Sequence, residues 1–372
     1  MFRFIHTADW QLGKPFGRMA PELAANLRRA RIDAVGRIAG AARRGGAGHV
    51  VVAGDVWDCE TPQAETVAQP LDAMKDASDL VWWLLPGNHD PAARGGLWDR
   101  LRERGMPANV RCLCDAKPVE AAPGVYLLPA PWGSKNPGRD LTEDFATWET
   151  PGSRLRIGVA HGGVHEFSQD AVQSSAIAQD AARRADLDYL ALGDWHGHKM
   201  IDPRTWYAGT PEPDRFPDNE PGYVLLVELS PNMDPKVERV PVARYHWSRD
   251  ALDLTDGADP IAVFDALHEE GAARADRLAK VTVTGTTRMD ARTAFLKHVE
   301  GRKASYAHLE TSHDALTTLV SADGFDALDR EGSLRQTAER LHARSLSTEI
   351  GADERGTARL ALDLLMTLAE DA

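Results

Sequence analysis

Five short apolar runs in the first 200 residues each lead into Asp, Asn or His, and this feature constrains the fold most. The runs end near Asp9, Asp55, Asn88, His161 and Asp194. Such β-rich runs alternate with helical segments, which is typical of a layered α/β domain. Because sites in open α/β sheets form beyond the carboxyl ends of strands, we expect these side chains to converge.

The residue types at these strand ends suit divalent metal ions. Carboxylate, amide oxygen and imidazole match manganese, iron or zinc, and the lack of thiolates argues against a structural zinc site. A single Asp after a strand is more often a turn or capping residue, so the prediction depends on the whole set. The set is too large for one ion, and a carboxylate shared by two ions is the usual basis of a two-metal centre for phosphoryl chemistry. Phosphoester hydrolysis is therefore the first hypothesis.

The ordered motifs DWQ, GDVWD, GNHD, AHGG and GDWHGH closely resemble those of the calcineurin-like metallophosphoesterases. Within that superfamily, FIHTADWQLGKPF and YAGTPEP are similar to the SbcD-type DNA repair nucleases, which are relatives of the meiotic recombination nucleases. The resemblance implies an α/β fold, namely a layered metallophosphoesterase β-sandwich flanked by helices. A small α+β capping domain and C-terminal helices would follow it.

The resemblance also implies two metal positions that share Asp55. The first ion would be held by Asp9, Gln11, Asp55 and His198, and the second by Asp55, Asn88, His161 and His196. A hydroxide that bridges the two ions would attack the phosphodiester in line, without a covalent enzyme intermediate.

Two further residues receive catalytic roles from the same resemblance. His89 would lie near the scissile phosphate and either stabilise the developing charge or protonate the leaving oxygen. Asp58 would orient His89 as its acidic partner, and the alternative is a helix N-cap or an acid at the edge of the core.

Gln11 departs from the family, which normally has histidine at this position. An amide oxygen is a poorer ligand for zinc and is better tolerated by manganese or magnesium. We therefore expect two divalent ions, with manganese preferred over magnesium, iron or zinc and with weaker occupancy of the first position. In the alternative, Gln11 does not coordinate, and Asp9, Asp55 and His198 hold the ion together with waters.

The pattern of strands and helices divides the chain into three parts. With the resemblance, residues 1–240 are expected to form the metallophosphoesterase (nuclease) domain, 241–322 the small α+β capping domain, and 323–372 a C-terminal helical segment. The terminal helices either pack on their own chain or dock on a partner. From the resemblance, the expected partners are DNA, an SbcC-like SMC-family ATPase and a second copy of the chain.

The charge of the chain limits how it can hold an anionic substrate. A formal net charge of −13 argues against binding of nucleic acid by bulk electrostatics. Bound divalent ions would supply a local positive centre. Trp10, Trp57 and Trp195 either stack on bases or, more commonly, pack their loops. Candidate phosphate contacts, for which surface solubility is an equal explanation, are Lys14, Arg94, Lys135 and Arg215.

The cysteines and the N-terminus indicate the compartment. Three cysteines in 372 residues make no disulfide framework, which fits a reducing environment. The first residues begin a strand directly, and no apolar run reaches the roughly 18 residues of a membrane span. We expect a cytoplasmic protein without a membrane association.

Three functions remain open at this point. The leading hypothesis is a metal-dependent exonuclease or endonuclease subunit in DNA repair. The alternatives are a stand-alone phosphodiesterase or phosphatase for nucleotides or small phosphoesters, and a weakly active scaffold of a repair complex. The segment beyond residue 240 favours a macromolecular substrate or partner. Gln11 alone supports the scaffold, while Asn88 and His89 count against it.

Overall fold

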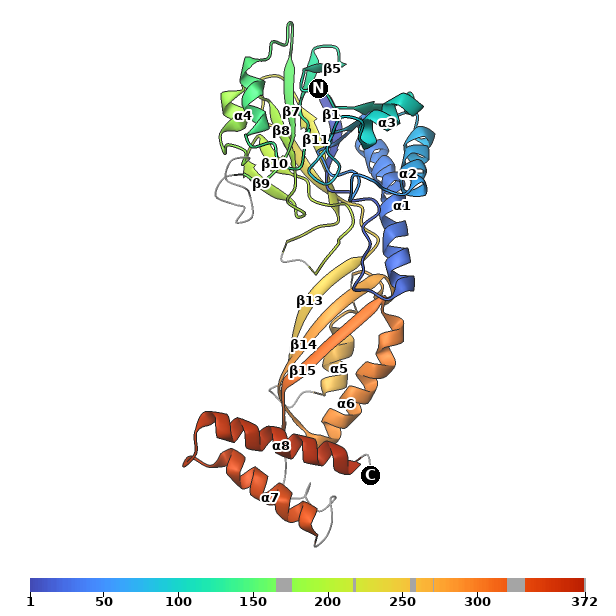
Figure 1. The fold of residues 1–372 in the computed structure, drawn as a ribbon. Coiled ribbons are helices and arrows are strands. Elements are labelled where there is room, and N and C mark those ends of the chain that lie inside the picture. Colours follow the sequence, from blue (N-terminus) through green and yellow to red (C-terminus); the bar gives the residue numbers. More distant parts are fainter. Residues whose placement is uncertain (165–175, 217–218, 255–258, 270, 320–331, 371–372) are drawn as a thin grey trace. The chain divides into compact units, whose positions relative to one another are not determined.

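The computed structural model describes all 372 residues except 165–175, 217–218, 255–258, 270, 320–331 and 371–372. The chain forms two compact units, Met1–His246 and Trp247–Ala372, and each is described by itself (Figure 1).

The first sheet of the first unit has the strand order β12-β11-β1-β2-β3-β4. Its members are β1 (Phe2–Thr7), β2 (His49–Val52), β3 (Val81–Leu84), β4 (Val110–Cys112), β11 (Tyr223–Leu229) and β12 (Lys236–Pro241). Strands β1 to β4 are parallel neighbours, whereas β11 runs antiparallel to both β1 and β12. The carboxyl ends of β1, β2 and β3 therefore meet at one edge.

The second sheet has the order β5-β6-β7-β8-β10-β9. Its members are β5 (Val119–Ala122), β6 (Val125–Ala130), β7 (Leu155–His161), β8 (Tyr189–Gly193), β9 (Lys199–Asp202) and β10 (Thr205–Tyr207). The four central strands are parallel, and the two edge strands pair antiparallel. Strands β7 and β8 thus also end side by side.

Alternating side chains explain why the strand sequences are continuously apolar. In β1, Phe4 packs into the core between the two sheets, while its neighbour Ile5 packs toward the helices. Trp82 and Trp83 in β3 divide in the same way. Successive side chains of a strand point to opposite faces, so a sheet covered on both faces needs apolar residues at every position.

Helices cover the outer faces of both sheets. Those on the first sheet are α1 (Pro21–Gly45), α2 (Ala64–Asp76) and α3 (Leu97–Arg104), and those on the second are η1 (Leu141–Thr147) and α4 (Ala181–Arg184). Helix α1 begins with Pro21 in its first turn and ends at Gly46, whose φ of 64° is left-handed. The predicted β-sandwich flanked by helices is confirmed.

The second unit contains a three-stranded sheet and four α-helices among its described residues. The sheet order is β13 (His246–Asp253), β14 (Arg277–Arg288) and β15 (His308–Leu319), with short 3₁₀ turns η2 (Arg274–Asp276) and η3 (Lys303–Ser305). Helices α5 (Pro260–Ala266) and α6 (Met289–Arg302) pack on it through Phe264 and Phe295. Helices α7 (Ser333–Leu346) and α8 (Ala352–Glu370) contact each other.

The sequence predicted an α+β part followed by a helical segment in this region, and the described residues contain both kinds of structure. The expected boundary between residues 322 and 323, however, lies outside the described residues. The contacts group the α+β part and the terminal helices in one unit. The three-domain division therefore stays a prediction.

Two of the three cysteines are paired in the structure, in one local bond. Cys112 and Cys114 are joined at the end of β4, and Cys59 is exposed. The bond spans two residues and so crosslinks no distant elements. Among the described residues, no helix combines the length and the apolar character needed to cross a bilayer.

Candidate metal centre

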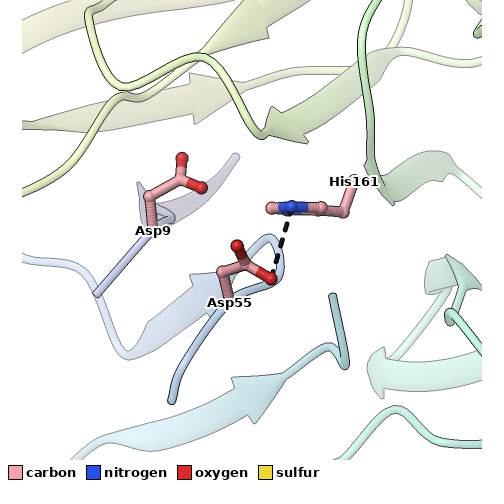
Figure 2. A group of neighbouring side chains, drawn as sticks. All are labelled: Asp9, Asp55 and His161. Atoms are coloured by element: carbon pink, nitrogen blue, oxygen red, sulfur yellow. Dashed lines mark ion pairs between the residues drawn. The ribbon is translucent and has the colours of Figure 1, made fainter. Parts of the chain in front are cut away.

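Asp9, Asp55 and His161 come together at the carboxyl ends of β1, β2 and β7. One ligand atom of each lies within 4.8 Å of the others. Figure 2 shows the two carboxylates and the imidazole converging from three separate strand ends. All three residues are buried, with 0%, 2% and 3% of their surface exposed. Buried carboxylates need a positive partner, so this cluster is a candidate cation site.

The loops that carry these ligands have an unusual backbone. Asp9, Gln11 and Asp55 have φ values of 54°, 40° and 55°, a region that residues other than glycine seldom adopt. Main-chain hydrogen bonds from Asp9 to Gly54 (3.1 Å) and from Gln11 to Asp55 (2.9 Å) tie the two loops together. Strained residues cluster at functional sites, where the surrounding structure holds them in place.

Two glycines make room for the cluster. A Cβ at Gly54 would lie 2.2 Å from Nδ1 of His161, and a Cβ at Gly87 would lie 2.2 Å from Oδ1 of Asp55. Neither position could accept a larger residue without displacing a candidate ligand. This explains the glycines in the motifs GDVWD and GNHD.

The hydrogen bonding of His161 directs a lone pair into the cluster. Its Nδ1 lies 2.9 Å from the carbonyl oxygen of Ala53, which can only accept, so Nδ1 carries the proton. Nε2 then offers a lone pair 2.9 Å from Oδ1 of Asn88 and 3.4 Å from Oδ1 of Asp55. With a neutral imidazole and the oxygen of Asn88 inward, three acceptors face one another, which is an arrangement that a metal ion satisfies.

The amide of Asn88 can face this group in two ways. With its nitrogen inward, it would donate to His161 at 2.9 Å and to both oxygens of Asp55 at 3.2 and 3.3 Å. With its oxygen inward, the three acceptors need a positive charge between them, supplied either by a second proton on His161 or by a metal ion. The donor set of carboxylate, amide oxygen and imidazole therefore fits a divalent ion.

The pKa values show how strongly the cluster favours a positive charge. Burial lowers the pKa of His161, but the charges of Asp55, Asp9 and Asp194 outweigh burial and hold it well above the usual value. Burial also raises the pKa of Asp55, yet His161 and His89 bring it down to about 2. Burial raises the pKa of Asp9 to about 6, and the charges of His196 and His161 offset this only in part.

His196 approaches the cluster from the loop after β8. Its Nε2 lies 3.9 Å from Oδ1 of Asp9 and 3.3 Å from Nε2 of Gln11. On the other side of the ring, Nδ1 lies 3.1 Å from the buried Oδ2 of Asp214. A carboxylate behind an imidazole is the arrangement that orients histidine ligands of metals.

The structure gives His198 different surroundings from those expected of a first-metal ligand. Its Nδ1 lies 4.0 Å from Oε2 of Glu220 and is buried without a hydrogen-bond partner. Burial lowers the pKa of His198, with a further contribution from Arg239. Within the described residues, the acid that reaches His161 from this loop is Asp194, with 4.0 Å between Oδ1 and Nε2.

His89 lies beside the cluster with its side chain partly open to solvent. Its Nε2 is 3.9 Å from Oδ2 of Asp55, and its main-chain N–H donates to Oδ1 of Asp55 at 3.0 Å. Nδ1 lies 3.0 Å from the main-chain carbonyl oxygen of Asp58. Asp58 thus contacts His89 through its backbone, while its carboxylate lies 3.7 Å from Nζ of Lys14.

Three further acids support the centre, and of these only Asp194 was expected there, as one of the converging side chains. Asp194 and Asp214 contact the histidines as described above. Buried Asp90 accepts hydrogen bonds from the main-chain N–H groups of Trp57 (3.0 Å) and Gly87 (2.8 Å), which joins the loops after β2 and β3. Asp194 and Asp90 belong to the motifs GDWHGH and GNHD, and Asp214 directly follows YAGTPEP, so a position in or beside a motif was the available signal.

The tryptophans of the ligand loops divide into two kinds. Trp10 and Trp57 are buried, and Trp57 packs against Trp98, so for these two the packing role is confirmed. Trp195 is 38% exposed, and Nζ of Lys199 lies 5.2 Å from its ring centroid.

The candidate phosphate contacts differ in their surroundings as well. Lys14 pairs with Asp214 at 3.0 Å and Lys135 pairs with Glu60 at 2.9 Å. Arg215 lies 3.3 Å from Asp214, and Arg94 is exposed. Three of the four therefore have acidic neighbours, and their role toward phosphate stays a prediction.

Two known proteins are similar to this chain over roughly two thirds of its length. The chain is 27% identical over 238 residues to the DNA double-strand break repair protein Mre11 of Haloferax volcanii, and the match covers 62% of this chain and 50% of that protein. This chain thus spans about half the length of that relative. The crystal structure of TT1561 of Thermus thermophilus aligns with 65% of this chain and 99% of its own, at 11% identity and a TM-score of 0.41.

The family model of the calcineurin-like phosphoesterases matches residues 2–227, which contain both sheets up to β11 and every candidate ligand. With this match and the buried cluster of Asp9, Asp55 and His161, the chain belongs to the calcineurin-like phosphoesterase family.

Proposed function

We propose that the protein is a metal-dependent phosphodiesterase that cleaves DNA. The observation that carries the proposal is the burial of Asp9, Asp55 and His161 within 4.8 Å of one another at the sheet edges. Membership of the phosphoesterase family supports hydrolysis of a phosphoester. The similarity to a DNA double-strand break repair protein supports DNA as the substrate.

The proposed ligands follow the sequence expectation, and the contacts support them unequally. The candidates are Asp9, Gln11, Asp55, Asn88, His161, His196 and His198, with manganese as the proposed ion. Contacts within the cluster support Asp9, Asp55, Asn88 and His161 most directly. Bound divalent ions would provide a nucleophile at neutral pH and offset the negative charge of the phosphoryl group.

His89 is the proposed catalytic residue of the protein itself. It is the partly exposed imidazole beside Asp55, so it can reach a phosphate that enters from solvent. Its Nδ1 is anchored by the carbonyl oxygen of Asp58, which leaves Nε2 to stabilise the developing charge or to donate a proton. Asp58 would act as a positioning residue through its backbone.

The second unit supports a macromolecular substrate or partner. Helices α7 and α8 expose large apolar side chains, including Leu346, Leu360 and Leu364, which are 61%, 66% and 61% exposed. Such side chains are suited to an apolar partner surface. We propose that these helices dock on an SbcC-like SMC-family ATPase and that the nuclease acts as a homodimer.

The test compares four substrates in the presence of Mn²⁺: linear duplex DNA, single-stranded DNA, circular DNA and a small phosphodiester ester. We expect DNA cleavage that is lost in Asp55→Ala and in His89→Asn. Hydrolysis of the small ester alone would refute DNA as the substrate and favour a stand-alone phosphodiesterase. If none of the four substrates is cleaved, the hydrolase proposal fails and the scaffold alternative is favoured. Cleavage that survives both substitutions would be due to a contaminant.

A further inference from the structure

The candidate centre has two halves whose polar atoms are satisfied differently. The His161 half consists of Asp55, Asn88 and His161, and the Gln11 half consists of Asp9, Gln11 and His196. In the His161 half, Nε2 of His161 lies 2.9 Å from the Asn88 amide and 3.4 Å from Oδ1 of Asp55, and with the amide oxygen inward these side chains turn their acceptor atoms toward one another. The following inference rests on the proposed function, because it concerns the ions of that same site.

In the Gln11 half, protein donors already occupy the atoms that would bind an ion. Nζ of Lys14 donates to Oε1 of Gln11 at 2.7 Å. An ammonium has only donors, so the amide nitrogen of Gln11 must point the other way, toward Nε2 of His196 at 3.3 Å. Both the amide oxygen and the imidazole lone pair are therefore engaged within the protein.

The other ring nitrogen of His196 agrees with this assignment. Because Nε2 accepts from Gln11, Nδ1 carries the proton and donates to Oδ2 of Asp214 at 3.1 Å. Nη2 of Arg215 also lies 3.0 Å from this Nδ1, and Nε of Arg215 lies 3.3 Å from Oδ1 of Asp214, which is the acceptor for both side chains. The amide of Gln11 and the imidazole of His196 therefore have protein partners without a metal ion.

Lys14 is held in place from several directions. Its Nζ lies 3.0 Å from the buried Oδ2 of Asp214 and 3.7 Å from Oδ1 of Asp58. The main-chain N–H of Lys14 bonds to the carbonyl oxygen of Gln11 at 3.2 Å, which closes a tight turn. Gly13, with a φ of 95°, provides the left-handed residue of that turn. The local sequence Gln-Leu-Gly-Lys thus places the ammonium on the glutamine.

We infer that Lys14 is a built-in cation that replaces the divalent ion at the first metal position. The protein then binds one ion tightly at the His161 half and a second only when Lys14 gives up its contact with Gln11. The positive charge of Lys14 repels a second ion, and its hydrogen bond removes the amide oxygen as a ligand. Asp214, which the sequence interpretation left without a role, fixes Lys14 and His196 together.

The test counts ions rather than products. The metal-free full chain is titrated with Mn²⁺ by calorimetry, and manganese retained after desalting is measured by mass spectrometry. Electron paramagnetic resonance then distinguishes an isolated Mn²⁺ from a spin-coupled pair. The variants are Lys14→Met, Lys14→Gln as a second neutral replacement, and Lys14→Arg, which keeps the charge. Lys135→Met is the matched control, because Lys135 pairs with Glu60 instead.

We expect wild type, Lys14→Arg and Lys135→Met to retain one Mn²⁺ per chain with the spectrum of an isolated ion. Both neutral variants should bind a second ion at least about tenfold more tightly and show a coupled pair. Two ions of equal affinity in wild type, or neutral variants that bind like wild type, would overturn the inference. Ion counts as expected without phosphodiester cleavage would refute the proposed function and leave this inference standing.

Discussion

Two buried histidines, His161 in the first unit and His268 in the second, lie beside acidic residues in opposite hydrogen-bonding environments. Nε2 of His268 lies 3.2 Å from Asp250, and its Nδ1 lies 3.0 Å from the hydroxyl of Tyr306. One partner accepts and the other donates, so a neutral ring satisfies both. Burial lowers the pKa of His268 and Arg277 lowers it further, while Asp250 only partly compensates.

His161 lacks such a match at Nε2 when the oxygen of Asn88 faces inward, because Asn88 and Asp55 are then both acceptors. The charges of Asp55, Asp9 and Asp194 hold the pKa of His161 well above the usual value despite burial, so this position attracts a positive charge, as a proton or as a metal ion. A histidine next to a carboxylate is therefore not in itself a metal ligand. His161 and His268 differ in whether a hydrogen-bond donor of the protein faces the ring nitrogen that carries the lone pair. Substitutions at both histidines and at their neighbours test this contrast.

Removing the carboxylate beside His161 should affect activity, whereas removing the carboxylate beside His268 should affect stability. Asp55→Ala should lower phosphodiester hydrolysis by about 10³-fold, because ions that stabilise transition-state charge lose a shared ligand. Asp250→Ala should leave hydrolysis within about twofold but cost about 1–3 kcal/mol of stability, because Nε2–H of His268 stays buried without an acceptor. Steady-state rates and urea unfolding of both variants measure this. Equal loss of activity in both variants would contradict the contrast.

Manganese should stabilise the folded chain through His161 and not through His268. An ion that binds the folded state alone adds about 2.7 kcal/mol at a free concentration of about 100 times its Kd. We expect this gain in wild type and in His268→Ala, with most of it lost in His161→Ala. Urea unfolding with Mn²⁺ and with a chelator gives the difference. Persistence of the gain in His161→Ala would place the ion elsewhere.

His6 is a third buried histidine, and both of its ring nitrogens have suitable hydrogen-bond partners. The pH dependence of stability can test its protonation state. Its Nδ1 lies 3.0 Å from the hydroxyl of Tyr189 and Nε2 3.1 Å from the carbonyl oxygen of Leu192. Burial lowers the pKa of His6 to about 3, so the folded state keeps the ring neutral while the unfolded state gains a proton below about pH 6.5. Stability is therefore lost as the pH falls.

This loss should amount to about 2 kcal/mol between about pH 7.5 and about pH 5. The Gln side chain of His6→Gln cannot take up a proton. Between the two pH values, the unfolding free energy of this variant should therefore fall by about 2 kcal/mol less than that of wild type. Urea unfolding of both proteins with a chelator, at both pH values, measures the slope of stability against pH for each protein. Parallel slopes would show that His6 is already charged in the folded state.

The smallest expected effect concerns the exposed tryptophan. Trp195→Ala should raise the KM for single-stranded DNA by roughly tenfold, because base stacking on an aromatic ring contributes about 1–3 kcal/mol. The KM for a small phosphodiester ester should not change, since that ester is too short to reach the ring. Kinetics with both substrates decide this. Equal changes for both would mean that Trp195 positions the His196 loop instead of a base.

The strands and the convergence of the site could be predicted because they follow from patterns that the residues carry. Apolar runs such as HVVVA mark strands covered on both faces, and carboxyl ends of parallel strands share an edge. For this reason Asp9, Asp55 and His161 were expected together before any distance was known. An α+β part and terminal helices after residue 240 were expected from periodicity in the same way.

The remaining details depend on backbone angles and on contacts between distant segments. Asp194 has a φ of 101°, which redirects the loop after β8 so that Asp194 and His196 reach the cluster while His198 pairs near Glu220. Spacing within GDWHGH does not reveal that turn. The contact of Lys14 with Asp214 joins two segments far apart in the chain, and no local pattern predicts it.

A divalent ion at Asp55, Asn88 and His161 is the central claim for this site. The direct measurement is anomalous diffraction at the manganese edge from crystals grown with Mn²⁺. We predict a strong peak coordinated by these three residues and a weaker peak, or none, beside Gln11. No peak at Asp55, or a single peak bounded by Asp9 and Gln11 alone, would contradict this assignment.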